Sequence, residues 1–407
     1  MTHAVHDSQG DAVEAAFDSG PGSPSHGDGY DRSLVVLHVS QPTNAGVRAV
    51  VLDLLRDQMQ RGWKVLLACP EANDLDAQCR RLGATWIPWN ATRNPGAKVL
   101  SECLRLRRII NDMRPDVVHL HSSKAGLAGR LVLRGRLPTV FEPNGWSFHA
   151  VDGWLATGSR WWERFASRWT HSTVCVSETE QSAALQAGMK ARWDIVRNGI
   201  DLRVWQQPEA DSRKAACDRL QLDPDVQNVL CVGRLCRQKG QDLLLRAWQE
   251  VRRQHPRARL YLVGDGPDRP SLESLSDDSV TFVGLRSDVR DWFLAADLIA
   301  MPSRWEGLSI ALLEAMSCAR PVIAAEVSGM REAIGETAGV LIPPEDVAAL
   351  AEGIANLLSS PETLAEIGAS ARQRVVAEFD QSVTNSRIAA IYRRLLDDRS
   401  IRLSSGE

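Results

Sequence analysis

Valine, isoleucine and leucine gather in short apolar segments along the first half of the chain, with segments of helical periodicity between them. The predicted strands are residues 34–40, 64–69, 85–89, 116–121, 138–142, 172–177 and 193–197. A helix is predicted after the first strand, because apolar residues recur there at the spacing of one helix face: Val47, Val50, Val51, Leu54 and Leu55. Continuous apolar strands separated by helices are typical of a parallel sheet covered on both faces. The pattern therefore predicts a first α/β domain.

The same alternation starts again after a polar interval, with strands predicted at 228–235, 258–265, 280–284, 297–302, 321–327 and 339–343. The interval begins with the turn-rich segment 197–201 and continues with the polar residues 206–214, which we interpret as a linker. Helical patterns follow the last strand at 348–358, 361–379 and 381–397. We expect the last helix to pack back across the hinge.

The length agrees with two domains, since 407 residues are long for one core and suit two domains of about 150 to 200 residues each. The predicted organisation is a disordered tail at 1–30, a first Rossmann-like domain at 31–205, a second at 206–380, and a C-terminal helix with a tail at 381–407. The predicted fold class is α/β, with two doubly wound parallel sheets. Gly46 lies at the turn from the first strand into the first helix, on the ligand-binding edge of such a sheet.

Composition argues against several partners and locations. The formal net charge is −3, so no global basic field suggests a nucleic-acid partner. The eight cysteines are scattered without a C-x-x-C pair, which is typical of reduced core residues in a cytoplasmic protein. The first thirty residues lack an apolar core and no later segment suits a membrane span, so neither a signal peptide nor a span is expected. His3, His6 and His26 are irregularly spaced, which favours solvated tail residues over a metal site.

Two glutamates flank the point where the predicted strand 297–302 gives way to a helix: Glu306 and Glu314, with seven residues between them. Ser309 is a typical helix N-cap, so the backbone amides from Gly307 onward are predicted to be free. Free amides and the positive end of a helix dipole suit a phosphate, whereas carboxylates suit sugar hydroxyls. A ligand with both groups is a nucleotide sugar. A solvated Glu314 is the alternative, which its position on the apolar side of the helix disfavours.

Basic side chains follow the first strand of the second predicted domain. Arg234 and Lys239 lie in the turn between this strand and the next helix. A planar guanidinium and a compact ammonium together suit a diphosphate, although a merely solvated basic loop is the alternative. The next strand ends at Gly264, in a Gly-Asp-Gly-Pro sequence that permits close backbone approach. The spacing G-x-G-x-x-G is absent, which argues against a dinucleotide.

Two short sequences raise the question of a metal. His119 and His121 lie on one face of a predicted strand, with His121 at its end, but no third ligand is evident nearby. We therefore interpret them as core or cleft residues. Asp74 and Asp76 match the bare D-x-D spacing of metal-dependent sugar transferases, yet their place before an apolar helical segment favours acidic residues at a helix start. No metal site is predicted.

Aromatic and basic residues alternate along the segment 160–169. The aromatic residues Trp161, Phe165 and Trp169 recur every four positions, and so do the arginines at 160, 164 and 168. The two series therefore form adjacent stripes of one helix. One interpretation is a helix that packs its aromatic stripe into the domain. The other is a surface that binds anionic lipid or an acceptor.

Taken together, residues 34–397 resemble the group 1 retaining glycosyltransferases, family 4, whose GT-B fold has two Rossmann-like domains that face a cleft. The motifs that carry the resemblance in the second half are 233–235 with 239–240, 263–267, 283–284 and 306–314. Those in the first half are 119–126 and 198–201. The sequences His-Ser-Ser-Lys-Ala-Gly and Gly-Trp-Ser-Phe are most similar to bacterial enzymes that build polysaccharides or other glycoconjugates.

The resemblance implies a role for each matching residue of the second half. Arg234 and Lys239 would hold the donor diphosphate. Glu314 would bind the ribose hydroxyls and Glu306 the transferred sugar. The other donor-binding positions are Gly46 from the first half, Gly264, Val283, Gly284, Gly307, Leu308 and Ser309. Of these, Gly307, Leu308 and Ser309 would offer backbone amides, and the backbone near Val283 and Gly284 would meet the base.

In the first half, His121 would lie near the transferred sugar and the acceptor, and it joins Glu306 and Asn144 as an expected catalytic residue. Asn144 stands where relatives commonly have histidine before Gly-Trp-Ser-Phe, and an amide neither accepts a proton nor becomes cationic. The loop at 44–47 is Asn-Ala-Gly-Val where relatives often have two adjacent glycines. Neither difference touches the residues expected at the donor phosphates.

The resemblance implies transfer of a sugar, with retention, from a nucleotide-diphosphate sugar to a glycan, lipid-linked or small-molecule acceptor. No metal or other cofactor is expected, so electrostatic stabilisation of the departing diphosphate would be the main catalytic task. The expected location is cytoplasmic, with peripheral contact at the inner face of the cell membrane through 160–169 as one interpretation. A sugar-nucleotide epimerase and a non-catalytic nucleotide-sugar-binding protein are the alternatives. Domain closure on donor binding is expected, because Gly46 must meet a ligand held mostly by the second domain.

Overall fold

The computed structural model describes residues 33–43, 45–72, 74–93 and 95–405. The predicted tail at 1–30, with His3, His6 and His26, lies outside the described residues, and so does Asn44. By its internal contacts the chain divides into Met1–Ser33 and Leu34–Glu407. All elements below belong to the second of these units.

A seven-stranded parallel sheet forms within the first half of the described chain, in the order β3-β2-β1-β4-β5-β6-β7. Its strands are β1 Val35–Ser40, β2 Lys64–Cys69, β3 Thr85–Pro88, β4 Val117–His121, β5 Thr139–Glu142, β6 Ser172–Cys175 and β7 Trp193–Ile195. Its helices are α1 Ala45–Gln60, α2 Leu75–Arg81, α3 Val99–Met113, α4 Ser122–Leu133, η1 Ser147–His149, α5 Gly153–Ala166, η2 Ser167–Trp169 and α6 Glu178–Gln186. The strand order reverses between β1 and β4, and ligands of such sheets bind where the loops after those two strands diverge.

A six-stranded parallel sheet forms in the second half, in the order β10-β9-β8-β11-β12-β13. Its strands are β8 Asn228–Val232, β9 Arg259–Val263, β10 Val280–Gly284, β11 Leu298–Met301, β12 Val322–Ala325 and β13 Val340–Ile342. Its helices are α7 Ser212–Leu220, η3 Arg237–Lys239, α8 Gln241–Gln254, α9 Arg269–Glu273, α10 Val289–Ala295, α11 Ile310–Ser317, α12 Ser328–Ile334, α13 Val347–Leu358 and α14 Pro361–Glu378. Here the order reverses between β8 and β11.

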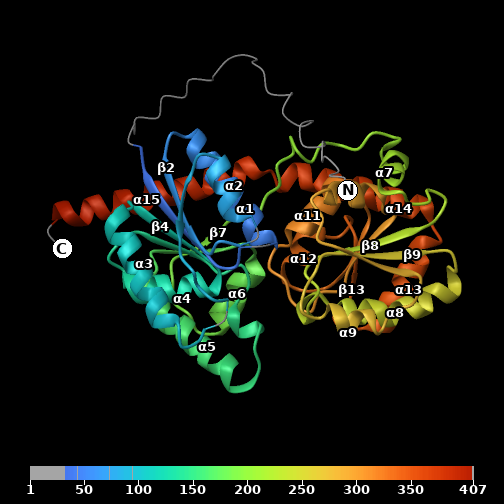
Figure 1. Cartoon of the computed structure of the whole chain (residues 1–407), viewed down its shortest axis with the longest axis horizontal. Coiled ribbons are helices and arrows are strands. Elements are labelled where there is room, and N and C mark those ends of the chain that lie inside the picture. Colours follow the sequence, from blue (N-terminus) through green and yellow to red (C-terminus); the bar gives the residue numbers. More distant parts are fainter. Residues whose placement is uncertain (1–32, 44, 73, 94, 406–407) are drawn as a thin grey trace, which may run out of the picture. The chain divides into compact units, whose positions relative to one another are not determined.

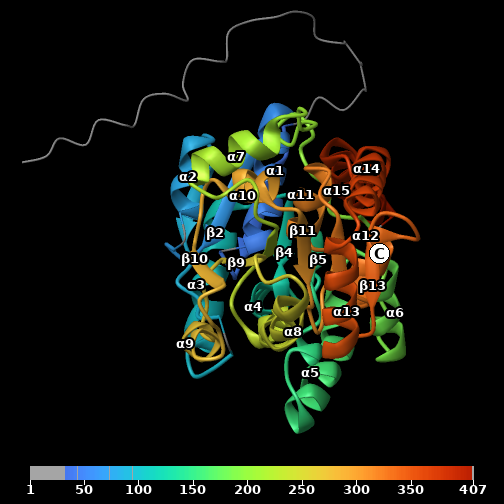
Figure 2. The same ribbon diagram turned by 90° about the vertical axis from the view of Figure 1, so that its right-hand side faces the viewer.

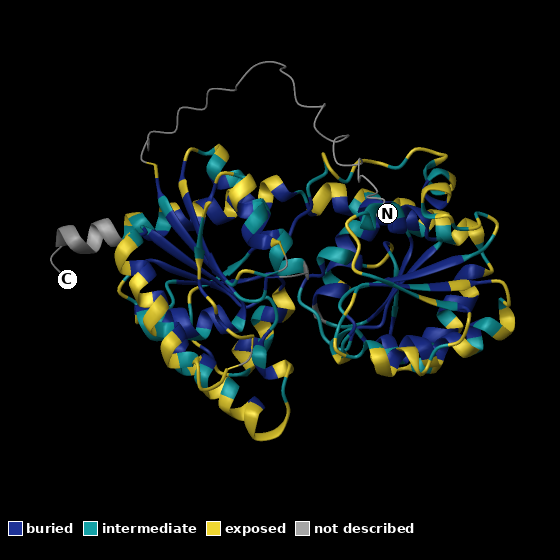
Figure 3. Cartoon of the chain, viewed as in Figure 1, coloured by how far each residue is buried: buried dark blue, intermediate teal, exposed yellow. Residues whose placement is uncertain are grey.

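Helices cover both faces of each sheet (Figure 1, Figure 2). In the first sheet, one apolar cluster joins the strands to α1, α2 and the C-terminal helix α15 Gln381–Ser405, and a second joins them to α3, α4 and α6. In the second sheet, α8 and α13 cover one face, while α10, α11, α12 and α14 cover the other. The inner strands of each sheet are almost entirely buried (Figure 3), which explains why they are continuous apolar segments in the sequence, whereas most residues of the edge strands β3, β7, β10 and β13 are only partly buried.

The prediction of two parallel-sheet α/β domains is confirmed, and each predicted strand range contains a strand of the structure. The strands are shorter than predicted where the apolar residues run on into the following loop, as at Leu235 and Val327. The predicted domain limits at 205 and 380 stay a prediction.

The chain passes between the two halves twice, near residues 200 and 380, and these two segments lie side by side. Ile200 forms a parallel bridge with Asp380, and its N–H donates to the Phe379 carbonyl at 2.8 Å. From this point α15 runs along the first sheet, where Ile388 and Tyr392 are buried in the same cluster as α1. The C-terminal helix thus packs on the first sheet although it follows the second in sequence.

Candidate active site

The loops after β8 and β11 meet where the strand order of the second sheet reverses. Lys239 ends the short helix η3 after β8, and its ammonium Nζ binds the Glu306 carboxylate from the loop after β11. The Ser303 hydroxyl donates to Glu306 Oε1 at 2.9 Å. Adjacent parallel strands deliver both loops to the same edge, so the fold itself brings together residues 67 positions apart.

Further bonds make these two loops one rigid unit. The Arg304 N–H donates to the Gln238 carbonyl at 2.8 Å, and Gln238 Nε2 donates to the Trp305 carbonyl at 3.1 Å. The Arg304 guanidinium donates to both carboxylate oxygens of Asp242, each at 2.8 Å. This bidentate geometry fixes the loop that presents Glu306.

The charges at this edge favour an anion. Burial lowers the pKa of Lys239, but the Glu306 carboxylate outweighs burial, so the pKa lies above its ordinary value and the ammonium stays charged. Arg234, in the same turn, has no ion pair with any described residue. Burial and then the charge of Arg234 lower the pKa of Arg93, which indicates that two guanidinium groups lie near each other. A bound anion would relieve this repulsion.

The helix α11 starts at this same edge, directly after the Glu306 loop. Ser309 is its N-cap, as predicted, but the Ser309 side chain makes no capping hydrogen bond. The N–H groups of Gly307, Leu308 and Ser309 donate to no described residue. Asn198 Nδ2 donates to the Leu308 carbonyl at 2.9 Å and thereby orients this loop. The free amides and the helix start suit a phosphate.

Glu314 lies one turn into α11 and is half-buried. Its carboxyl group has no hydrogen bond or ion pair with any described residue. Burial, and then the nearby Asp53 carboxylate, raise its pKa to about 8. At neutral pH the group is therefore mostly protonated, and it can both donate and accept hydrogen bonds. The prediction that Glu314 is not a merely solvated residue agrees with this environment.

Glycines let the ends of β8, β9 and β10 pack against one another. A Cβ atom on Gly264 would lie 2.0 Å from the Gly233 carbonyl oxygen, and Gly264 has φ +138. The Gly264 N–H donates to the Gly284 carbonyl at 2.9 Å. Gly284 follows Val283 at the end of β10, so the expected base-binding backbone lies beside the loop after β8.

The first sheet contributes less to this edge than predicted. Gly46, in the first turn of α1, lies near the start of α11, where an added Cβ would contact Ile310 at 3.4 Å. Asn144 lies beside Gly307 and has φ +51. His121 is fully buried at the end of β4 and contacts other buried polar residues instead of an open surface.

These polar residues form a network that the sequence did not reveal. His38 lies on β1 in register with His119, and His38 Nδ1 is 2.9 Å from His121 Nε2. Glu142 Oε2 lies 3.2 Å from His119 Nε2 and 3.5 Å from His121 Nδ1. His119 Nδ1 is 2.7 Å from the Tyr392 hydroxyl, on α15. The three histidines and Glu142 share one face of the sheet, because they lie at alternate positions of neighbouring parallel strands. Tyr392 reaches this face from α15.

The expectation that no third candidate ligand lies near His119 and His121 was wrong, since His38 brings three imidazole nitrogens within 4.8 Å of one another. Three buried imidazoles with outer partners are the usual ligands of Zn²⁺. Nitrogens bound to one tetrahedral metal at about 2.0–2.1 Å stand about 3.3 Å apart. The separation of 2.9 Å between His38 Nδ1 and His121 Nε2 is shorter and matches a hydrogen bond between the two imidazoles.

Burial lowers the pKa values of His38 and His119, which keeps these imidazoles neutral. Burial alone would raise the pKa of Glu142, but the adjacent imidazoles of His119 and His121 hold the pKa well below its ordinary value. An ionised carboxylate therefore lies among imidazoles at the carboxyl end of β5, two residues before Asn144.

The segment 160–169 is helical, as predicted, but it tightens into η2 at Ser167. The rings of Trp161 and Phe165 stack on each other outside the core, with 5.4 Å between their centroids. Trp161 is 63% exposed, and Trp154, at the start of the same helix, is 81% exposed. The interpretation that α5 packs its aromatic stripe into the domain is therefore wrong for Trp161. The buried face of α5 carries Glu163, which pairs with Arg130.

Asp74 and Asp76 lie at the start of α2, as predicted. Asp74 is the N-cap residue, and Asp76 belongs to the first turn and pairs with Arg80 at 3.4 Å. Asp74 lacks a capping side-chain bond and has φ +61 instead. This arrangement explains the D-x-D spacing by helix structure alone.

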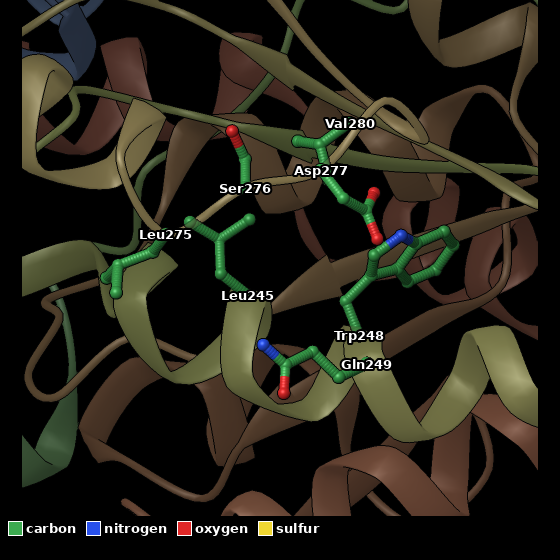
Figure 4. Close-up of a pocket in the computed structure, with 7 residues that line it drawn as sticks. All are labelled: Leu245, Trp248, Gln249, Leu275, Ser276, Asp277 and Val280. Carbon is green, nitrogen blue, oxygen red and sulfur yellow. The ribbon is translucent and has the colours of Figure 1, made fainter.

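A separate hollow of about 130 Å³ lies between α8 and the start of β10, lined by Trp248, Asp277 and Val280 among others (Figure 4). Val280 begins β10 and Gly284 ends it. The hollow is therefore at the amino edge of the sheet, opposite the loops that carry Lys239 and Glu306. Ligands of parallel sheets bind at the carboxyl edge.

Several residues of the site were missed by the sequence patterns. Ser303 and Asn198 contact the Glu306 loop, and His38, Glu142 and Glu180 support the first-sheet side. Ser303 and Asn198 belong to turn-rich segments, which is a usable signal for a loop contact. His38, Glu142 and Glu180 lie in ordinary strand or helix patterns, and only register and packing bring them to the site.

No helix among the described residues is both long and apolar enough to span a membrane.

Comparisons with known proteins agree with this architecture. Residues 45–204 match the family model "Glycosyltransferase Family 4", and residues 226–360 match "Glycosyl transferases group 1". A GDP-mannose-dependent mannosyltransferase of Corynebacterium glutamicum is 26% identical over 88% of this chain and 97% of its own length. The alpha-D-kanosaminyltransferase of Streptomyces kanamyceticus is 31% identical over 69% of this chain and 71% of its own length.

Solved structures share the fold. Anabaena HepE, solved in complex with UDP and glucose, has a TM-score of 0.76 and 20% identity over 88% of this chain and 98% of its own. Sucrose-phosphate synthase from Thermosynechococcus elongatus has a TM-score of 0.77 and 23% identity over 89% of this chain and 99% of its own. With its two parallel sheets, its matched family models and these relatives, the chain belongs to the group 1 glycosyltransferases of family 4 and has the GT-B fold.

Proposed function

We propose that this glycosyltransferase moves a sugar from a nucleotide-diphosphate sugar, with retention and without a metal, to a glycan, lipid-linked or small-molecule acceptor. The observation that carries the proposal is the Lys239–Glu306 pair beside the free amides of α11, where the strand order of the second sheet reverses. A cation, a helix start and the carboxyl groups of Glu306 and Glu314 at one edge fit the two halves of a nucleotide sugar.

The diphosphate is assigned to Arg234, Lys239 and the amides from Gly307 to Ser309. Breaking the bond to the sugar leaves negative charge on the departing diphosphate, and these donors are already in place before the reaction. Because they need no rearrangement at that moment, they stabilise the leaving group at low cost. A charge-assisted hydrogen bond of this kind contributes about 1.5 to 3 kcal/mol.

Glu306 has a second role in this proposal. It balances Lys239 in the absence of donor, and a bound diphosphate would take over part of that balance. The Glu306 carboxylate is then free to accept hydrogen bonds from hydroxyls of the transferred sugar. Glu314 is assigned to the ribose hydroxyls, because its carboxyl group is half-buried and unpaired at the same edge.

The assignment of a nucleotide-sugar donor is supported by the printed names of relatives. The mannosyltransferase relative is GDP-mannose-dependent, and HepE was crystallised with UDP-glucose as well as with UDP and glucose. These names differ in base and sugar, so the donor of this chain is left to experiment. The backbone at Gly264, Val283 and Gly284 is proposed to meet the base.

The first sheet is proposed to bind the acceptor. Gly46 approaches the diphosphate from the start of α1, and Asn144 lies beside Gly307, where its amide would position a hydroxyl. His121 is proposed to act near the sugar through its buried network. The catalytic set in this proposal is Glu306, His121 and Asn144.

We assign a peripheral membrane contact on the cytoplasmic side to α5. Trp154, Leu155 and Trp161 are exposed apolar residues of this helix. The arginines at 160, 164 and 168 are exposed beside them. Exposed aromatic residues flanked by arginines suit the interface of an anionic bilayer, which would bring the enzyme to a lipid-linked acceptor.

The proposal is tested by nucleotide-diphosphate release from uridine, guanosine, thymidine and adenosine diphosphate sugars. The native chain is compared with Lys239→Ala and Glu314→Ala, and with Lys190→Ala and Glu366→Ala as controls at exposed positions. We expect one donor to be cleaved by the native chain and both controls, and neither site variant to retain activity. Cleavage that survives Lys239→Ala and Glu314→Ala would refute the site. Conversion of the donor sugar without nucleotide release would indicate the epimerase, and tight donor binding with no cleavage a binding protein.

A further inference from the structure

A buried glutamate holds the turn that carries Asn144. Glu180 lies in the first turn of α6 and is 4% exposed. Its carboxylate accepts the Gly145 N–H at 2.6 Å through Oε1 and the Val176 N–H at 2.8 Å through Oε2. The Ser177 hydroxyl accepts the Glu180 N–H at 3.0 Å, as in a capping box. The glutamate of a capping box usually bonds the N-cap amide, whereas Glu180 reaches the loop after β5 instead.

The turn that Glu180 holds is left-handed. Asn144 has φ +51 and Gly145 has φ +97; glycine adopts such values freely, and asparagine adopts the left-handed region more readily than other residues. A third bond fixes the same turn, because Trp146 Nε1 donates to the Glu180 carbonyl at 2.7 Å. Without Glu180 the half-buried Gly145 amide would lose its hydrogen-bond partner, so the turn depends on α6.

The clamped segments are those that contact the donor loop. A Cβ atom on Gly307 would lie 3.1 Å from Val176 Cγ2, 3.8 Å from the Gly145 nitrogen and 4.0 Å from the Asn144 carbonyl carbon. The two N–H groups that donate hydrogen bonds to the Glu180 carboxylate therefore belong to residues packed against Gly307. The Glu180 carboxylate therefore bonds residues that directly contact the loop with the proposed phosphate-binding amides.

We propose that Glu180 is a positioning residue of the transferase, whose carboxylate holds the Asn144–Gly145 turn against Gly307 and so aligns the first-sheet side of the site with the donor. The proposal rests on the proposed function. Glu180 itself touches no reacting group. It acts through the position of Asn144 and of the Gly307 loop.

Ionisation of Glu180 is part of this role. Burial raises the pKa of its carboxyl group to about 7, and this effect outweighs the hydrogen bonds from Val176 and Gly145, which lower it. Glu142 at the end of β5 and Glu332 on α12 raise it further, and the Cys175 thiol of β6 also lies near. Only the ionised group offers both oxygens as acceptors, so protonation weakens one of the two clamping bonds.

The direction of the Glu180 pKa shift distinguishes a role in positioning the turn from a role in stabilising the fold. A carboxyl whose pKa is raised on folding binds more protons in the folded than in the unfolded state between about pH 4.3 and 7. Its contribution to stability therefore falls as pH rises through that window. Ionised Glu180 costs stability, so a purely structural side chain at this place gains nothing from being charged.

The first experiment needs no substrate. Hydrogen exchange of the peptide spanning 143–148 is measured at pH 8 for the native chain, Glu180→Gln and the control Glu178→Gln, an exposed glutamate on the same helix. In Glu180→Gln the side-chain NH₂ group would face one of the two backbone N–H donors and could not accept its hydrogen bond. We therefore expect faster exchange of this peptide. Equal exchange in Glu180→Gln and the native chain would overturn the clamp.

The second experiment measures donor cleavage from pH 6 to 9, together with the melting temperature at pH 8. We expect the native rate constant to fall below about pH 7 and that of Glu180→Gln to be flat and about tenfold lower, as for one lost hydrogen bond. The melting temperature of Glu180→Gln should not fall. A Glu180→Gln enzyme that keeps the native rate and pH profile would overturn the proposal.

The two experiments also separate this proposal from the proposed function. If the peptide 143–148 exchanges faster in Glu180→Gln while the native chain cleaves no donor, Glu180 holds the turn and the transferase proposal fails. Should Glu180→Gln not fold, Glu180→Asp provides the same comparison, because its shorter carboxylate cannot reach both amides.

Discussion

At the scale of single residues, the site depends on positions where a side chain is excluded. Gly264 is such a position, since a Cβ atom there would lie 2.0 Å from a carbonyl oxygen that belongs to Gly233. The three loop ends that surround the proposed base and diphosphate pack this closely only without side chains. The sequence showed the small residues, and the structure shows which backbone atoms they admit.

We predict that Gly264→Ala destabilises the protein by about 2 to 4 kcal/mol, because it combines overpacking with a φ that alanine avoids. Thermal unfolding measures the effect. Gly158→Ala is the matched control, because an added Cβ at this α5 position meets no atom within 4 Å. Alanine in a helix interior should raise stability slightly. Equal melting temperatures for the two variants would contradict this account of the loop packing.

The buried carboxylate of Glu142 leads to a prediction of pH dependence. Burial raises the pKa of Glu142, but the adjacent imidazoles of His119 and His121 lower it more, so the net pKa is depressed. A depressed acid pKa stabilises the folded state above the unfolded pKa of about 4.3 and loses this effect as pH falls below it.

Glu142→Gln should therefore cost about 2 to 3 kcal/mol at pH 7, and the difference from the native chain should shrink below about pH 4. Denaturant unfolding at several pH values tests this, with Glu366→Gln as the exposed control. A difference that grows on acidification would show that the carboxylate is not the stabilised form.

At the scale of elements, α15 is bound to the first sheet by polar as well as apolar contacts. The Tyr392 hydroxyl lies 2.7 Å from His119 Nδ1, and Tyr392 is fully buried. Tyr392→Phe removes this partner without changing the shape of the ring. We expect a loss of about 1 to 2 kcal/mol and faster hydrogen exchange in α15 than in α14. Exchange that accelerates equally in both helices would indicate global unfolding instead.

The helix α5 carries a prediction of its own. Changing the arginines at 160, 164 and 168 to glutamate should abolish binding to vesicles that contain anionic lipid, and native binding should weaken with added salt. The control changes Arg246, Arg253 and Arg257, which are exposed residues of the second sheet's domain, to glutamate. This control makes the same change in net charge. Equal loss in both variants would mean that net charge, and not α5, governs binding.

At the scale of the whole molecule, hydrogen bonds join the two sheet domains at the start of α6. The Glu332 carboxylate on α12 accepts the Glu178 N–H at 3.0 Å and the Thr179 N–H at 2.8 Å, at the start of α6. Further contacts described above are those of Asn198 with Leu308, of Gly46 with Ile310, and of Val176 and the Asn144–Gly145 turn with Gly307. Contacts of this kind are compatible with relative movement of the two domains.

Nucleotide binding should therefore lower the radius of gyration in solution scattering, because a diphosphate held by Lys239 would also attract the start of α1 at Gly46. Lys239→Ala is the control and should show no change at the same nucleotide concentration. A native chain that binds nucleotide with an unchanged scattering curve would exclude closure.

The sequence by itself determined the fold class, the order of the strands and helices, and the presence of a basic turn and a Glu-x₇-Glu loop. These features are local, because strand periodicity, N-caps and turn residues depend on neighbours in the chain. The resemblance added the identity of the motifs and their expected roles.

Tertiary structure alone decided which distant residues meet. His38 joins His119 and His121 because β1 and β4 are neighbours in register, and Glu180 reaches Gly145 because the start of α6 lies beside the loop after β5. It also decided that Trp161 faces outward, since the buried side of α5 is taken by the Glu163–Arg130 pair. Such contacts depend on strand order, register and helix rotation, which are set by the packing of the whole core and leave no periodic signal in the sequence.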